Sequence, residues 1–194
     1  MVDSNEVEHK IRARLKDDNY QAMRFSAAEI LDAINAVVAS LVLEFKLNRA
    51  QRLARLSEQA RFMRTPYILG IIEAKFEGKH LEFRTEVDNA LELSLFIQPE
   101  ALSVSPFKPG LLSVIYYAYE PIKQLDQPLP LPPIATDAVV YGALALLLEV
   151  PTDESNFNKI GVYKNLFKEA KNLLTLYLNS LYASKNYASR VVKV

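Results

Sequence analysis

The sequence predicts a mainly α-helical protein with a β insertion, which is a fold of the α+β class. Three observations lead to this prediction. Apolar residues recur every three to four positions towards both ends of the chain, they alternate with polar residues in the middle, and a proline-rich segment separates the two patterns. We expect a single domain with a bundle of about four helices formed by residues 1–44 and 134–184, a small antiparallel sheet within residues 65–120, and an extended tail over residues 185–194.

Composition limits the classes of function that the chain can have. Half of its 194 residues are apolar, and 23 basic side chains balance 23 acidic ones. The chain therefore has enough apolar residues for a core, and no net charge that would attract nucleic acid or an acidic membrane. Cysteine is absent, which excludes disulfides, thiol nucleophiles and cysteine-ligated zinc. The polar first ten residues do not resemble a signal peptide, and the longest apolar run, residues 138–148, is too short to span a bilayer.

Two helices are predicted in the first 44 residues. Apolar residues at a spacing of four indicate a short amphipathic helix from residue 4 to about residue 17. Ser26-Ala-Ala-Glu29 has the pattern of a capping box, in which the serine and the glutamate each bond the other's backbone amide, and it predicts a helix over residues 26–44. Phe25 precedes the cap and is expected to pack on the first turn.

Residues 45–64 fit two structures. As a helix, this arginine-rich segment would place several arginines near one face, where they could contact a phosphate backbone or simply face solvent. As a strand, it would begin the β insertion, because an alternation starts at Leu53. Periodicity alone does not separate the two.

The middle of the chain has the signals of β-structure. A turn at Gly78 is expected to join two strands into a hairpin, and the sequence PFKPG is expected to be the loop of a second hairpin. The strands are expected over residues 67–76, 80–85, 89–97, 101–105 and 111–119. Large side chains occupy both faces of the last strand, so we expect parts of both faces to be covered, either within the fold or by a partner.

The C-terminal part is again helical. Pro121 should end the last strand, and four further prolines should hold residues 128–133 extended on the way back to the helices. Residues 138–148 are apolar all round, which predicts a central helix that starts near Thr136 or Asp137. Gly142 within it would allow another helix to approach closely. A last helix, capped by Thr152 or Asp153 and running to about residue 184, has an apolar stripe of Ile160, Tyr163, Phe167, Ala170, Leu174, Tyr177, Leu178 and Leu181.

No motif for catalysis, metal binding or cofactor binding is present. The two histidines, His9 and His80, have no metal-ligand spacing, and the sequence has neither a glycine-rich phosphate loop nor a Gly-x-Ser-x-Gly motif. Adjacent carboxylates such as Asp17 and Asp18 are better explained as charges at a helix end. We therefore expect a protein that is not an enzyme and that needs no cofactor and no metal.

The order of these elements resembles the head-to-tail adaptor (connector) proteins of tailed bacteriophages, along nearly the whole chain. Members of that family begin with a short helix and a motif that corresponds here to Arg24, Phe25, Ser26, Glu29, Ile30, Leu31, Ile34 and Asn35. Their later motifs correspond to Tyr116, Tyr117, Pro121, Leu131, Pro132 and Asp137, and their closing helix has aromatic residues where this chain has Tyr163 and Phe167. The chain lacks the histidine that the family often has near Asp137, and residues 45–105 match only in outline.

The resemblance implies a structural protein of the virion neck. Such proteins form a homo-oligomeric ring, usually twelve-fold, beneath the portal, bind the next tail, nozzle or stopper protein, and surround the channel through which double-stranded DNA passes, with no membrane involved. By resemblance, the C-terminal segment docks on the portal, and here it would use Tyr187, Arg190, Val191, Val192, Lys193 and Val194. We expect Glu77, Gly78, Lys79 and His80 to contact the next ring, and Arg49, Arg52 and Arg55 are candidates for the channel lining.

Two other functions stay open from the sequence. A neck stopper or tail-completion protein is the nearest alternative, although such proteins are mainly β and this chain predicts several helices. A helical nucleic-acid-binding or regulatory module that uses the arginines of residues 49–64 belongs to a different class.

Overall fold

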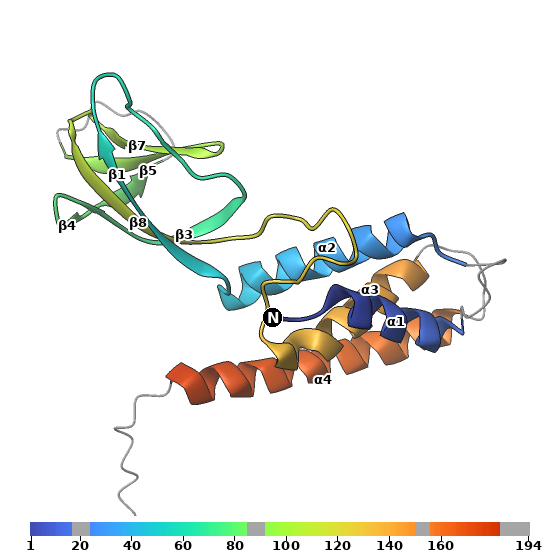
Figure 1. Ribbon diagram of the computed structural model, residues 1–194. Coiled ribbons are helices and arrows are strands. Elements are labelled where there is room, and N and C mark those ends of the chain that lie inside the picture. Colours follow the sequence, from blue (N-terminus) through green and yellow to red (C-terminus); the bar gives the residue numbers. More distant parts are fainter. Residues whose placement is uncertain (17–23, 85–91, 150–155, 183–194) are drawn as a thin grey trace, which may run out of the picture.

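A computed structural model describes residues 1–16, 24–84, 92–149 and 156–182, which form a helical module and a β module (Figure 1). The predicted α+β class is confirmed, because the described residues form four helices of three turns or more and two four-stranded sheets. The β module is inserted between the second and the third helix. The helices are α1 (Ser4–Leu15), α2 (Ala27–Phe45), α3 (Thr136–Glu149) and α4 (Asn156–Tyr182).

Local signals set the starts of α1 and α2. The Asp3 side chain caps α1 by accepting a hydrogen bond from the backbone amide of Asn5. The predicted capping box of α2 is confirmed, because the Ser26 hydroxyl accepts from the Glu29 amide at 3.2 Å and the Glu29 carboxylate accepts from the Ser26 amide at 2.7 Å. The backbone hydrogen bond from Ser26 lowers the pKa of the Glu29 carboxyl group. Phe25 is buried in the helical core, as expected for a residue that packs on the first turn.

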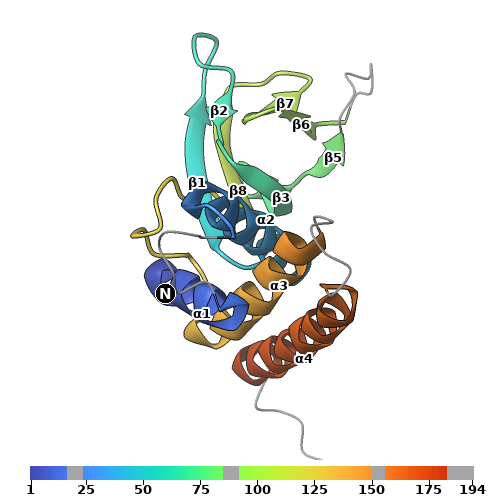
Figure 2. The same ribbon diagram turned by 90° about the vertical axis from the view of Figure 1, so that its right-hand side faces the viewer.

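Helix α3 is the centre of the helical module, as its composition predicted. It lies between α2 and α4, with α1 packed on a further side (Figures 1 and 2). Most of its side chains are buried, and Leu146, which is 40% exposed, is the main apolar exception. A Cβ atom built on Gly142 would lie 2.8 Å from Val37 of α2 and 3.1 Å from Phe167 of α4, which confirms that this glycine permits a close helix approach.

Helix α4 packs on α3 through most of the predicted stripe. Ala170 and Leu174 are buried, and Tyr163, Phe167, Tyr177 and Leu178 pack against the same core. Leu181 was wrongly included in this stripe, because it is 58% exposed. The last turn of α4 runs past the N-terminal start of α3 (Figure 1). The predicted caps at Thr152 and Asp153 lie outside the described residues.

The first sheet shows that residues 49–56 are a strand and not a helix. Its strand order is β1-β8-β3-β4, with β1 (Arg49–Leu56), β8 (Gly110–Ala118), β3 (Ile68–Phe76) and β4 (Lys79–His80). Strand β1 pairs along its whole length with β8, from Arg49 opposite Tyr117 to Leu56 opposite Gly110. The β insertion therefore begins well before residue 65. The deciding partner is about sixty residues further along the chain, so local periodicity could not reveal it.

The second sheet corrects two predicted hairpins. Its strand order is β2-β7-β6-β5, with β2 (Met63–Arg64), β7 (Ala101–Ser105), β6 (Ser94–Gln98) and β5 (Glu82–Arg84). The hairpin at Gly78 forms, but its second strand ends at His80, and β5 then pairs in parallel with β6 in the other sheet. The loop at residues 106–109 does not join a hairpin, because β7 and β8 belong to different sheets. Turn residues show that the chain bends without showing which strand it pairs with next.

The two sheets enclose the core of the β module. Leu112 and Val114 of β8 are buried, and Leu95 and Leu102 meet them from the second sheet. Helices and β module thus have separate apolar clusters, which meet where β8 and the segment after it reach α2.

Residues 119–132, which we call the crossover, run back from β8 to α3 along the helical module (Figure 1). The Asn35 carboxamide of α2 fixes its start: Oδ1 accepts from the Tyr119 hydroxyl at 2.5 Å and from the Ile122 amide at 3.0 Å, and Nδ2 donates to the Ile122 carbonyl at 3.0 Å. The predicted extension of residues 128–133 is interrupted, because the Leu131 amide bonds the Leu129 carbonyl at 2.8 Å. Residues 123–127 also bend, with the Gln127 amide 3.3 Å from the Gln124 carbonyl. The crossover is held at more than one point.

The N-terminus fixes the far end of the crossover. Val2 and Leu129 form an isolated antiparallel bridge with amide-to-carbonyl distances of 3.3 and 2.9 Å. The hydroxyl of the buried Ser4 lies 2.5 Å from the carbonyl oxygen of Leu125 and 2.6 Å from that of Gln127. Since proline removes backbone donors, these side-chain and terminal contacts replace the ladder that an ordinary strand would have.

We call the contact of Asn35 with Tyr119 and Ile122 the joint. The buried phenol of Tyr119 makes the joint sensitive to high pH. Burial raises the pKa of the Tyr119 phenol from its ordinary value of 10.0 to about 12, with a smaller opposite effect from the Ile122 backbone. Because the folded state keeps this proton longer than the unfolded state does, the contribution of Tyr119 is complete below pH 10 and is lost as pH rises from 10 to about 12. We measure the free energy of unfolding with urea at about pH 8 and about pH 11. We expect it to fall more between these pH values for the wild-type protein than for Tyr119→Phe. Equal losses in the two proteins would contradict this expectation.

Candidate functional site

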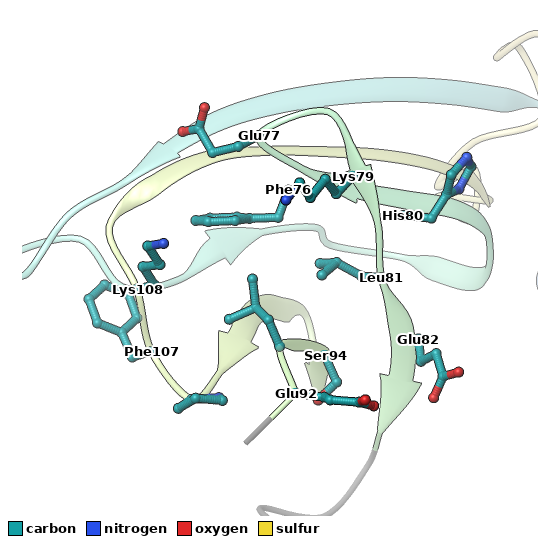
Figure 3. A pocket seen from close by; sticks show the side chains of 12 residues that line it. Phe76, Glu77, Lys79, His80, Leu81, Glu82, Glu92, Ser94, Phe107 and Lys108 are labelled. Atoms are coloured by element: carbon teal, nitrogen blue, oxygen red, sulfur yellow. The ribbon is translucent and has the colours of Figure 1, made fainter. Parts of the chain in front are cut away.

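The end of the β module contains a half-open pocket of about 750 Å³ (Figure 3). Its apolar lining is Phe76, Leu81, Leu93 and Phe107, and charged side chains surround this lining. The predicted contact residues Glu77, Lys79 and His80 are among the polar and charged residues that line the pocket. The structure therefore brings three of the four turn residues to one concave surface, together with residues near 107 that the sequence did not connect with them.

Hydrogen bonds fix the turn beside this pocket. The Leu111 amide donates to Glu77 Oε1 at 2.6 Å, and the Glu77 amide donates to the Leu111 carbonyl at 2.9 Å. Gly78 has a φ of 81°, a left-handed conformation that glycine adopts without strain. The His80 ring lies 3.3 Å from the Glu73 carboxylate and is 71% exposed. The turn is thus a fixed, exposed projection, which suits a contact with another protein.

The three candidate channel arginines do not share one face. Along β1, alternate side chains point to opposite sides, so Arg49 and Arg55 lie on one face and Arg52 on the other. Their spacing of three would have grouped them only on a helix. Arg49 also donates to the carbonyl of Lys46 at 3.0 Å. All three are exposed, but they do not form a single basic surface.

The predicted portal-binding residues 187–194 lie outside the described residues. That part of the prediction stays a prediction.

The described residues contain no cluster of three or more histidine, aspartate or glutamate side chains that could hold a metal ion. No helix in the described ranges is long and apolar enough to cross a membrane. The clearly shifted pKa values of Glu29 and Tyr119 are explained by a helix cap and by burial at the joint, and neither group lines the pocket.

No protein-family model matches this chain, and no curated protein matches it.

Sequence reasoning missed the contact between Asn35 and the crossover. Asn35 belongs to the first motif of the resemblance, and Tyr119 follows the end of β8, between Tyr117 and Pro121 of the second motif. The structure places these motifs against each other at a separation of 84 residues. A polar residue between apolar positions of an amphipathic helix was the one available signal.

Proposed function

We propose that this chain is a head-to-tail adaptor of a tailed bacteriophage, a structural subunit that forms a ring between the portal and the next tail protein and surrounds the DNA channel. The observation that carries the proposal is the meeting of the two motifs at the joint. The carboxamide of Asn35 holds both the last residue of the tyrosine-rich strand region and the residue after Pro121. Motifs that were noted separately in the sequence thus have one structural role.

The arrangement of modules also supports the proposal. An adaptor needs a rigid body with separate surfaces for its neighbours in the ring, for the portal and for the next ring. The helical module and the β module lie at opposite ends of the folded molecule (Figures 1 and 2). The joint and the N-terminal bridge hold the crossover that connects the two modules. The fixed turn at Gly78 is at the outer end of the β module, where a next ring would make contact.

The alternatives have less support. A helical nucleic-acid-binding module requires its arginines on one helix face, and residues 49–56 are a strand that divides them between two faces. A stopper is mainly β, whereas 72 of the residues that the structure describes belong to the α-helices α1 (12), α2 (19), α3 (14) and α4 (27). Balanced charge suits a channel, because DNA must slide without tight binding to phosphates.

The decisive experiment mixes the purified chain with the portal protein encoded in the same genome and images the particles. A ring of this chain docked under the portal is the expected result. A genome without a portal gene, or portal particles that never bind the chain, would overturn the proposal.

Deletion of residues 187–194 is expected to abolish docking on the portal while the helical circular dichroism stays unchanged. The physical reason is that the proposed anchors, Val191, Val192 and Val194, belong to this segment, whereas the residues that form the described helical core all precede it. As a matched control, Lys79→Ala in the turn of the β module should leave portal docking intact and weaken binding of the next ring. Docking by the truncated chain would show that the portal contact lies elsewhere.

A further inference from the structure

The outer side of α4 carries a second apolar surface that nothing in the described chain covers. Residues at successive spacings of four, seven and three lie on one side of a helix. Val162, Leu173 and Leu176 are 56, 58 and 65% exposed, and Leu166 between them is partly exposed. We call these four residues, together with Glu169 among them, the α4 stripe: Val162, Leu166, Glu169, Leu173 and Leu176.

The border of the α4 stripe carries little charge on the side away from the core. Asparagines follow it at a spacing of seven, at positions 165, 172 and 179, and all three are exposed. Amides are cheaper to remove from water than ammonium groups, and the buried centres of protein interfaces are depleted in charge. Lys159 continues the line of the stripe at its N-terminal end, whereas Lys171 pairs with Glu44 of α2 at 2.9 Å and Lys164 pairs with Glu149 of α3 at 2.7 Å. The stripe therefore has the composition of a protein contact surface.

Glu169 determines what kind of surface can cover the stripe. It lies midway between Val162 and Leu176, and within the described residues it has no ion pair or hydrogen-bond partner. If two copies paired their stripes antiparallel and symmetrically, the two Glu169 carboxylates would face each other, which is unfavourable. The stripe therefore calls for a different surface that is apolar and carries a cation.

The first sheet presents such a surface on its side away from the β core. Leu53, Arg55, Leu111 and Ile115 share this side, since Arg55 is opposite Leu111 and both Leu112 and Val114 point into the core. We call these four residues the β1–β8 outer face. Leu53 is 56% exposed and Leu111 is 42% exposed. Arg55 is exposed and, like Glu169, has no ion-pair partner in the described part of the chain.

The two surfaces cannot meet within one chain. Helices α2 and α3 lie between α4 and the β module, as both ribbon views show (Figures 1 and 2). We infer that the α4 stripe of one copy packs on the β1–β8 outer face of a second copy, with Glu169 paired to Arg55. Such a contact joins two different surfaces, so it repeats head to tail and can close into a ring. The inference deepens and rests on the proposed function, which calls for a ring.

Cysteine cross-linking tests this contact directly, because the natural chain has no cysteine. Asn172→Cys places the only thiol beside the α4 stripe, and Gln51→Cys places it on the outer side of β1. We expect a mixture of the two single variants to form a disulfide-linked dimer under mild oxidation, and the double variant to form a ladder of oligomers. Lys123→Cys, exposed on the crossover, is the matched control and should give only background cross-linking with either variant.

Two results would overturn the inference. Efficient cross-linking of Asn172→Cys with itself would show a symmetric α4 pair, and a mixture no more cross-linked than the control would show that the α4 stripe does not pack on the β1–β8 outer face. Portal docking is measured separately on the wild-type chain. Docking without the mixed cross-link contradicts this inference alone, whereas the mixed cross-link without docking contradicts the adaptor proposal alone.

Substitutions then test the chemistry of the contact in the full chain by sedimentation. Leu173→Gln is expected to weaken self-association at least about tenfold. Leu43 on α2 is a similarly exposed leucine, and Leu43→Gln should leave self-association unchanged. Arg55→Glu should weaken self-association about tenfold, and adding Glu169→Arg should restore most of it. If the paired charge reversal restores nothing although both variants are folded, Glu169 and Arg55 do not meet.

Discussion

Replacing Gly142 with leucine is expected to destabilise the folded chain by about 3 kcal/mol, because α3 has no room for a side chain at this position. Even a Cβ atom would lie 2.8 Å from Val37 Cγ1 and 3.1 Å from the Phe167 ring. Val37 is a short, stiff side chain on α2 and cannot rotate away at low cost. Gly142→Ala should therefore also destabilise the protein, by about 1 kcal/mol, although alanine favours helix formation.

Gly161 provides the matched control for this prediction. It lies in α4, is exposed, and has no heavy atom within 4 Å of an added Cβ. Gly161→Ala should stabilise the protein by about 1 kcal/mol, since the propensity gain meets no clash. Urea unfolding of the three variants measures these effects. A Gly142→Ala protein as stable as Gly161→Ala would show that α2, α3 and α4 pack less tightly than described.

These two glycines illustrate what the sequence could and could not predict. The helical positions were predictable because a capping box and a 3–4 spacing are local signals, and Ser26 and Glu29 form the predicted bonds. That Gly142 marks a close approach followed from its place in an apolar helix, whereas its neighbours Val37 and Phe167 required the fold.

Strand pairing was the main limit on prediction. Residues 49–56 carry no clear alternation because β1 is an edge strand whose side chains are mostly exposed on both faces. The strands on either side of residues 106–109 were expected to pair with each other, but β8 pairs with the distant strands β1 and β3, and β7 pairs with its neighbour β6 and with β2. Long-range pairing depends on contacts that no local window contains.

The candidate site was predictable only in part for the same reason. The turn at Gly78 was evident from its sequence, and it lies on the pocket as an exposed projection. The pocket itself also needs Phe107, which reaches it only because the chain changes sheets after β7. The three arginines were grouped by their spacing, and the strand then divided them between two faces.

Replacing Asn35 with alanine is expected to cost about 3 kcal/mol, because it leaves three polar groups at the joint without partners. The Tyr119 hydroxyl and both backbone groups of Ile122 bond this one carboxamide, and Tyr119 and Ile122 are only 3 and 8% exposed. Water therefore cannot readily replace the lost bonds. Asp32→Ala, on the exposed side of the same helix, is the control and should change stability by less than about 0.5 kcal/mol.

A second measurement separates the joint from a general loss of stability. Asn35→Ala should speed hydrogen exchange selectively at the amides of Tyr119 and Ile122 and along the crossover, while the core of α3 stays protected. Combined with Tyr119→Phe, the double substitution should show a coupling of about 1 kcal/mol, since both changes remove the same bond. If exchange rises uniformly and the coupling is zero, Asn35 does not fix the crossover. The β module would then be held to the helices by apolar contacts alone, and the two sequence motifs that meet at Asn35 would lose their common structural role.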